Sequence, residues 1–197
     1  NILNLLKPRK GKVRAVLDTD TYNEIDDQFA LVQMMLSADR IKVEAIYPAP
    51  FSMNDRSDHP GKGMELSYDE ILRCLERINI SPEGLVHKGV TEYIGSKKES
   101  IDAPAVDDLI NKANAGSKED PLYVIAIGAI SNVSSALLKA PEIKDKIDWN
   151  KREDMLRSLC DEFRNKSGNY DCLVPGSGGK DSAYTAHILK YKYNMDP

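Results

Sequence analysis

The sequence predicts an α/β fold with a mostly parallel, Rossmann-like sheet and helices on both of its faces. Residues 13–17 form a short, largely apolar, β-rich run, and residues 122–127 are apolar without interruption, as in buried parallel strands. Segments with apolar residues at helical spacing separate these runs, so successive strands are joined by helices and run parallel. Polar, turn-forming residues follow each run, which is where open α/β sheets place their ligand-binding loops.

Five segments are expected as strands, at about residues 13–18, 41–47, 85–87, 122–127 and 170–175. The second of them alternates apolar and polar positions, then turns continuously apolar until Pro48 and Pro50 end it. The third and fifth are short runs between turn residues. We expect the fifth to dock on the same sheet, because a separate domain of about 50 residues would bury too little apolar surface.

Helices are expected where apolar residues recur three and four positions apart. The first, at about 25–38, has Asn23 as its N-cap candidate, which places Asp26 and Asp27 in its first turn. Pro104 stands near the first turn of a later helix, a position that proline favours. The remaining helices are expected at about 62–78, 133–140, 155–163 and 180–193.

Composition indicates a globular protein and argues against two kinds of partner. The 197 residues are 41% hydrophobic and 29% charged, and the net charge of −4 gives no electrostatic footprint for nucleic acid. No apolar run approaches the roughly 20 residues that a membrane helix needs. The three cysteines are widely spaced and form no C-x-x-C pair, which favours reduced thiols in a cytoplasmic protein.

Acidic side chains crowd the loop between the first strand and the first helix. Asp18 and Asp20 end the strand, Glu24 follows, and Asp26 and Asp27 open the helix. Complementing the helix dipole would explain the last two acids but not the two that precede the loop. Mutual repulsion among so many carboxylates calls for protons or a cation, and Ca²⁺ suits a flexible set of oxygen ligands.

The same stretch resembles the amino-terminal signature of the inosine-uridine-preferring nucleoside hydrolases. Val16-Leu17-Asp18-Thr19-Asp20 is followed by Asp26-Asp27 and Ala30-Leu31, although residues 21–25 make the linker two residues longer than the family's usual form. The resemblance covers residues 13–147. It implies hydrolysis of the N-glycosidic bond of ribonucleosides by a water molecule that Ca²⁺ holds.

By this resemblance, the acidic residues take separate roles. Asp20 binds the metal and acts as general base, and Asp27 chelates the metal. Asp26 holds a ribose hydroxyl or assists at the metal. The transition state is oxocarbenium-like, and the nearby carboxylates stabilise it.

Two further site residues come from the same resemblance. Gly128-Ala129-Ile130-Ser131-Asn132 is similar to the family's Gly-x-Leu-Thr-Asn turn, so Ile127 contributes its backbone carbonyl to Ca²⁺. We interpret Ser131 and Asn132 as plain helix caps. Asn54 is the candidate for a ribose contact, and a simple turn residue is an equally good interpretation.

A second resemblance begins after residue 147. The residues between the expected strand and the last helix are Ser177, Gly178, Gly179, Lys180, Asp181 and Ser182. They resemble the PP-loop of ATP pyrophosphatases, and their flanks are similar to N-acetyl sugar amidotransferases, which implies ATP binding at these residues. A glycine-rich turn without a ligand is the alternative.

The two resemblances divide the chain into residues 1–147, a truncated nucleoside hydrolase-like region, and 148–197, a PP-loop-like fragment. The family's later His-Asp pair has no counterpart here, so we expect weak metal binding and little turnover. The leading function is nucleoside N-glycosidase with a small-molecule ribonucleoside partner. An ATP-binding fragment and a non-catalytic chimera are the alternatives. The sequence leaves open the preferred base, homo-oligomer formation, and whether the chain is a natural fusion, a truncated gene or an artificial chimera.

Overall fold

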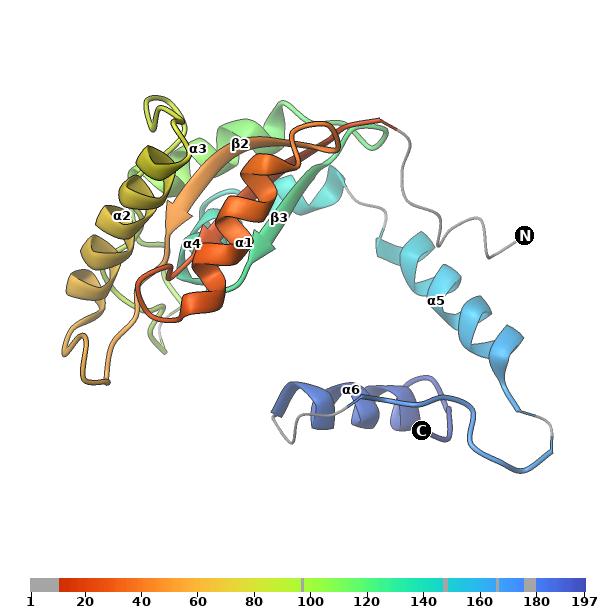
Figure 1. Cartoon of the computed structure of the whole chain (residues 1–197). Coiled ribbons are helices and arrows are strands. Elements are labelled where there is room, and N and C mark those ends of the chain that lie inside the picture. Colours follow the sequence, from red (N-terminus) through yellow and green to blue (C-terminus); the bar gives the residue numbers. More distant parts are fainter. Residues whose placement is uncertain (1–10, 97, 147–148, 166, 176–179) are drawn as a thin grey trace. The chain divides into compact units, whose positions relative to one another are not determined.

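A three-stranded parallel sheet forms the centre of the larger of two compact units (Figure 1). The computed structural model describes residues 11–96, 98–146, 149–165, 167–175 and 180–197. Its contacts divide the chain into one unit within Arg9–Ile147 and another within Asp148–Pro197.

The sheet has the order β2-β1-β3. Its strands are β1 (Val13–Thr19), β2 (Ile41–Pro48) and β3 (Leu122–Ala126). Asp18, near the end of β1, lies in register with Tyr47 of β2 and with Ala126 of β3. All three strands therefore end at the same edge of the sheet, and the predicted parallel α/β fold is confirmed.

Helices cover both faces of this sheet, because the strand side chains alternate between two cores. Ala15 and Leu17 pack with the buried residues of α1 (Ile25–Leu36) and α2 (Pro60–Arg77). Val16 packs on the opposite face with α3 (Pro104–Asn114) and α4 (Ser131–Lys139). A short 3₁₀ helix, η2 (Pro141–Lys146), follows α4. Successive side chains of a strand point to opposite faces of the sheet, and those of Ala15, Val16 and Leu17 in β1 do so.

Four local predictions are wrong. β3 is not buried as expected, because Val124 and Ala126 are exposed and its other residues are only partly buried. Residues 85–87 form only one isolated parallel bridge, between Val86 and Ile46, in place of a strand. Residues 170–175 contain no strand, so they add none to the sheet. Glu24, not Asn23, is the N-cap of α1, and it makes no side-chain capping bond.

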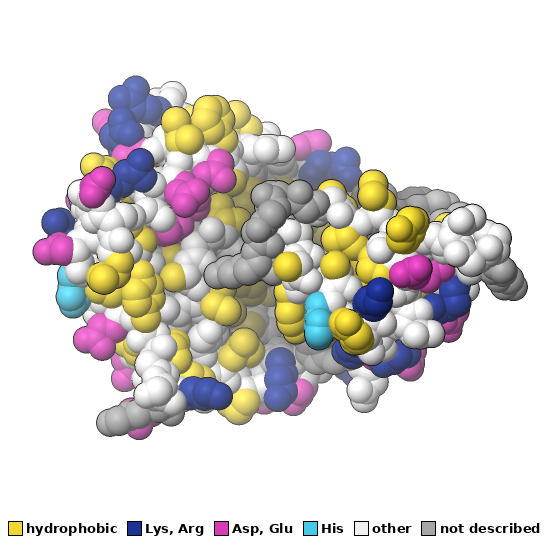
Figure 2. All heavy atoms as spheres, turned by 90° about the horizontal axis from the view of Figure 1, so that it is seen from below, with side chains coloured by type: hydrophobic (Ala, Val, Ile, Leu, Met, Phe, Trp, Pro, Cys, Tyr) yellow, Lys and Arg dark blue, Asp and Glu magenta, His cyan; other side chains and the backbone are white. Residues whose placement is uncertain are grey.

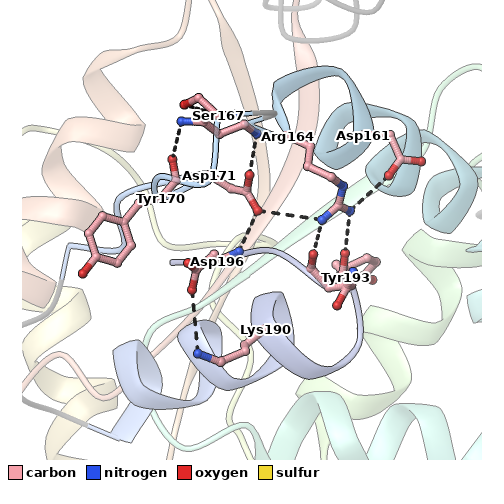
Figure 3. Close-up of polar contacts among 10 residues, drawn as sticks. Asp161, Arg164, Ser167, Tyr170, Asp171, Lys190, Tyr193 and Asp196 are labelled. Carbon is pink, nitrogen blue, oxygen red and sulfur yellow. Dashed lines mark hydrogen bonds and ion pairs between the residues drawn. The ribbon is translucent and has the colours of Figure 1, made fainter.

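The second unit contains α5 (Trp149–Phe163) and α6 (Lys180–Tyr191). Among the described residues of this unit, a small core is formed by the buried side chains of Cys160, Tyr193 and Met195. Arg164 lies beside this core and donates to the backbone carbonyl of Tyr193 at 3.0 Å and to that of Asn194 (Figure 3). Contacts of its carboxyl-terminal residues therefore hold much of this unit together.

The structure also describes the cysteines and shows whether any described helix could cross a membrane. Cys74, Cys160 and Cys172 are all free thiols, as predicted. Within the part of the chain that the structure describes, none of the helices combines the length and the apolar character needed to cross a membrane.

Candidate functional site

A cavity of about 400 Å³ opens where β1 leads into α1, beside the end of β3. We call it the acidic cavity; its lining residues are Asp20, Glu24, Asp26, Asp27, Phe29, Ala30, Gln33 and Ile127. Carboxylates and an apolar wall thus share one space. Such a combination of apolar surface and a few polar groups is typical of small-molecule sites.

Asp27 lies in the first turn of α1, and its side chain is buried. Only 5% of its surface is exposed, and Thr19 Oγ1, at the end of β1, donates a hydrogen bond to its Oδ1. Burial raises the pKa of Asp27 to about 6, although the bond from Thr19 opposes this shift, and the nearby charge of Asp20 adds to it. Charging Asp27 therefore costs more in the folded site than in water.

Asp20 is the next residue after β1, and its carboxylate is bonded to Asn23, which is in turn bonded to Asn54. Asn23 Nδ2 donates to Asp20 Oδ2 at 2.9 Å, and Asn54 Nδ2 donates to Asn23 Oδ1 at 2.7 Å. Burial raises the pKa of Asp20, and the bond from Asn23 works in the opposite direction. Asn23, which we expected as a helix cap, instead links Asp20 to Asn54.

Asp18 lies deeper than the cavity and is fully buried. Its Oδ1 accepts a hydrogen bond of 2.8 Å from Asn132 Nδ2, and its Oδ2 has no partner among the described residues. Burial raises the pKa of Asp18 to about 7; the bond from Asn132 opposes the rise and the charge of Asp20 adds to it. A buried carboxylate with an unpaired oxygen is rare and needs a physical explanation.

The remaining acids face outward. Asp26 and Glu24 line the acidic cavity but are exposed. Figure 2 shows one face of the protein, on which acidic side chains lie among hydrophobic ones. Across the described residues, no three side chains of His, Cys, Asp or Glu come together in an arrangement suited to a metal ion.

The structure brings together four of the five residues expected at the nucleoside site. Asp20, Asp26, Asp27 and Ile127 all line the acidic cavity. Asn54 does not line it. Its Oδ1 accepts the backbone N–H groups of Arg56 and Ser57, both at 3.0 Å, so it also closes a turn.

The expected ATP-binding segment lies largely outside the described residues. Residues 176–179 are not described, and Ser177, Gly178 and Gly179 are among them. The side chains of Lys180 and Asp181 are not described either, so ATP binding from there to Ser182 stays a prediction.

Sequence reasoning missed several residues that shape the site. Ser131 and Asn132 were expected as caps, but Ile130 is the N-cap of α4, and Asn132 contacts Asp18 instead. Phe29 and Gln33 form cavity wall that we did not foresee. They stand three and seven residues after Asp26, so helical periodicity was the signal that could have found them.

Comparison with known families bears on this geometry. Residues 14–170 match the model of the family described as cellulose-binding Sde182, nucleoside hydrolase-like domain. The chain belongs to this family. The match supports the nucleoside hydrolase-like region and runs past residue 147, where we expected the resemblance to end. It does not reach residues 177–182, and the PP-loop resemblance gains no support from it. No match is found among curated proteins.

Proposed function

We propose that the acidic cavity binds a divalent cation, Ca²⁺ by preference, and hydrolyses the N-glycosidic bond of a ribonucleoside. The observation that carries this proposal is the meeting of Asp20, Asp26, Asp27 and Ile127 around one cavity of about 400 Å³. Membership of a nucleoside hydrolase-like family supports the same assignment.

The donor chemistry fits Ca²⁺. The ligands assigned to it are carboxylate oxygens of Asp20 and Asp27 and the backbone carbonyl of Ile127, and Ca²⁺ takes six to eight oxygen ligands. Burial raises the pKa of both carboxyl groups, as described above, and a nearby cation would favour their charged forms. Two carboxylates are a small charge count, so we expect a Kd on the order of 10⁻⁴ to 10⁻³ M.

When bound, the cation supplies positive charge that orients hydroxyl groups and makes water more acidic. Asp20 is the general base: Asn23 holds its Oδ2, and we assign the proton taken from the attacking water to its Oδ1. A raised pKa suits this task, because an efficient base titrates near the working pH. Asp26, exposed at the cavity, receives a ribose hydroxyl.

Calorimetric titration with Ca²⁺ tests the cation site, using a matched pair of variants. Asp27→Ala removes a first-turn acid of α1 inside the cavity, whereas Asp107→Ala removes a first-turn acid of α3 that pairs with Lys139 elsewhere. We expect binding heat from the wild type and from Asp107→Ala, and none from Asp27→Ala. Absence of heat from the wild type would contradict the proposal.

Release of ribose from inosine, with and without Ca²⁺, tests the reaction. We expect release that depends on Ca²⁺ and on Asp20, at a low rate. Heat of Ca²⁺ binding without any ribose release would leave a cation site and remove the hydrolase assignment.

A second candidate function is binding of a cellulose-like glucan chain, which the family's description names for Sde182. The favouring observation is the ring of Tyr22, which is 42% exposed and stacks on Phe51 with ring centroids 6.4 Å apart. Exposed aromatic rings suit the apolar faces of sugar rings.

Retention on microcrystalline cellulose tests this second function. We expect Tyr22→Ala to lose retention. Tyr170→Ala is the control, since Tyr170 is an exposed aromatic residue of the other unit. Equal retention of wild type and Tyr22→Ala would exclude Tyr22 as the binding platform.

A further inference from the structure

The side chain of Asn132 joins three chain segments at the carboxyl edge of the sheet, and it is fully buried. Its Nδ2 donates to Asp18 Oδ1 at 2.8 Å and to the carbonyl oxygen of Pro48 at 3.1 Å. Its Oδ1 accepts the backbone N–H of Val90 at 2.8 Å. The carboxamide thus connects α4 to the end of β1, the end of β2 and the loop through residue 90.

The backbone at Gly89 packs closely against this carboxamide. A Cβ atom at Gly89 would lie 2.1 Å from the carbonyl oxygen of Pro48 and 2.8 Å from both polar atoms of Asn132. Real Cβ atoms do not approach backbone this closely. The backbone of residue 89 therefore lies directly against the carboxamide of Asn132, with no room for a side chain at residue 89.

Asp18 connects Asn132 to the acidic cavity. Among the described residues, Asn132 is the one side chain that donates a hydrogen bond to the Asp18 carboxylate. It bonds to Oδ1, and Oδ2 has no partner there. The carbonyl oxygen of Asp18 accepts the N–H of Ile127 at 2.9 Å. A Cβ at Gly128 would lie 2.8 Å from the backbone nitrogen and from Oδ1 of Asp20, so the turn after β3 lies directly against Asp20.

We propose that Asn132 is a positioning residue: by holding Asp18 it fixes the strand end that carries Asp20 and the turn at Ile127, and it thereby sets the cation affinity of the acidic cavity. The affinity part of this inference rests on the proposed function. The positioning part concerns the protein without any ligand, and the two are measured separately.

Three variants test the inference. Asn132→Ala removes all three hydrogen bonds. Ser135→Ala is the matched control, because Ser135 is also fully buried on α4 and its Oγ accepts the N–H of Ile101 at 3.2 Å, away from Asp18. Asn132→Ser, which puts one hydroxyl in place of the carboxamide, replaces Asn132→Ala in both measurements if the alanine variant does not fold.

The first measurement is amide hydrogen exchange of Ile127 without ligand. We expect Asn132→Ala to speed this exchange by about tenfold or more relative to Ser135→Ala, since hydrogen bonds to charged groups are among the stronger ones. The second measurement is titration with Tb³⁺, a luminescent stand-in for Ca²⁺. We expect Asn132→Ala to weaken Tb³⁺ binding by about tenfold, and Ser135→Ala to change it by less than about twofold.

The outcomes separate the inference from the proposed function. Equal Ile127 exchange in the Asn132 and Ser135 variants would overturn the inference, whatever Tb³⁺ does. Faster exchange with unchanged Tb³⁺ affinity would overturn its affinity part. Faster exchange in Asn132→Ala, with no Tb³⁺ binding by the wild type, would support positioning by Asn132 and overturn the proposed cation site.

Discussion

The hydroxyl of Thr19, the last residue of β1, donates a hydrogen bond to the carboxylate of Asp27, in the first turn of α1. The two residues are both buried and stand eight positions apart. This bond connects the strand to the helix across the acidic loop and orients one of the two carboxylates assigned to the cation. It also favours the charged form of Asp27, against the effect of burial.

Replacing Thr19 with valine is expected to raise the pKa of Asp27 above its value of about 6. The bond stabilises the carboxylate form, so its loss should move the pKa up by about one unit or more. NMR titration of the Asp27 carboxyl carbon measures this shift. Thr21→Val is the control, because Thr21 bonds to Thr19 at 2.9 Å and not directly to Asp27. An unchanged Asp27 pKa in Thr19→Val would contradict the prediction.

Stability without cation is expected to fall as the pH rises. Burial raises the pKa of Asp18 to about 7 and that of Asp27 to about 6, from 3.8. Between about pH 4 and 7 the folded state therefore binds more protons than the unfolded state, and raising the pH favours unfolding. We expect the Tm to drop by several degrees from pH 5 to pH 7.5.

Ca²⁺ should oppose that drop, since it binds the charged carboxylates. Thermal unfolding at both pH values, with and without Ca²⁺, measures the effect, and stabilisation by Ca²⁺ should be larger at pH 7.5. The Asp27→Asn variant should show a smaller drop. A Tm that rises from pH 5 to pH 7.5 in the absence of Ca²⁺ would be inconsistent with the two raised pKa values.

Gly128→Ala is expected to disturb the acidic cavity through lack of space. The added Cβ would lie 2.8 Å from the backbone nitrogen of Asp20 and 3.0 Å from Cβ of Ala49. Overpacking of this kind costs about 1–3 kcal/mol of unfolding free energy, which urea denaturation measures. Gly95→Ala is the matched control, because a Cβ at Gly95 meets nothing within 4 Å. Equal losses in the two variants would refute the crowding argument.

Arg164→Ala is expected to release the carboxyl-terminal residues of the second unit. Arg164 donates to the carbonyls of Tyr193 and Asn194, pairs with Asp161 at 3.1 Å and lies 3.8 Å from Asp171 (Figure 3). Loss of these contacts should speed amide exchange of Asp196 by about tenfold or more, since several are charge-assisted.

Lys190→Ala provides the comparison for Arg164→Ala. The Lys190–Asp196 pair is exposed at 3.7 Å, and such surface pairs contribute little. We expect nearly wild-type exchange of Asp196 in this variant. If Lys190→Ala speeds exchange as much as Arg164→Ala does, the prediction about Arg164 is wrong.

Patterns of local residues were sufficient for much of the fold. The β-rich apolar run of β1 and the helical spacing of α2 placed these elements to within a few residues, and Pro104 marked the start of α3. Prediction failed for residues 85–87 and 170–175, which are short apolar runs. A run this short becomes a strand only if a neighbouring strand supplies hydrogen-bonding partners, and no local pattern contains that information.

The sequence by itself determined the α/β class and the gathering of carboxylates after β1, because both follow from hydrophobic periodicity and from acids that are close together in the chain. Only the tertiary structure decided which groups hold those carboxylates. Asn132 reaches Asp18 across 114 positions and Asn54 reaches Asn23 across 31. Partners so distant in the chain are brought together by the packing of β1 against α4 and of neighbouring loops. From residue type alone, Asn132 and Asn54 are equally well interpreted as a cap and a turn residue.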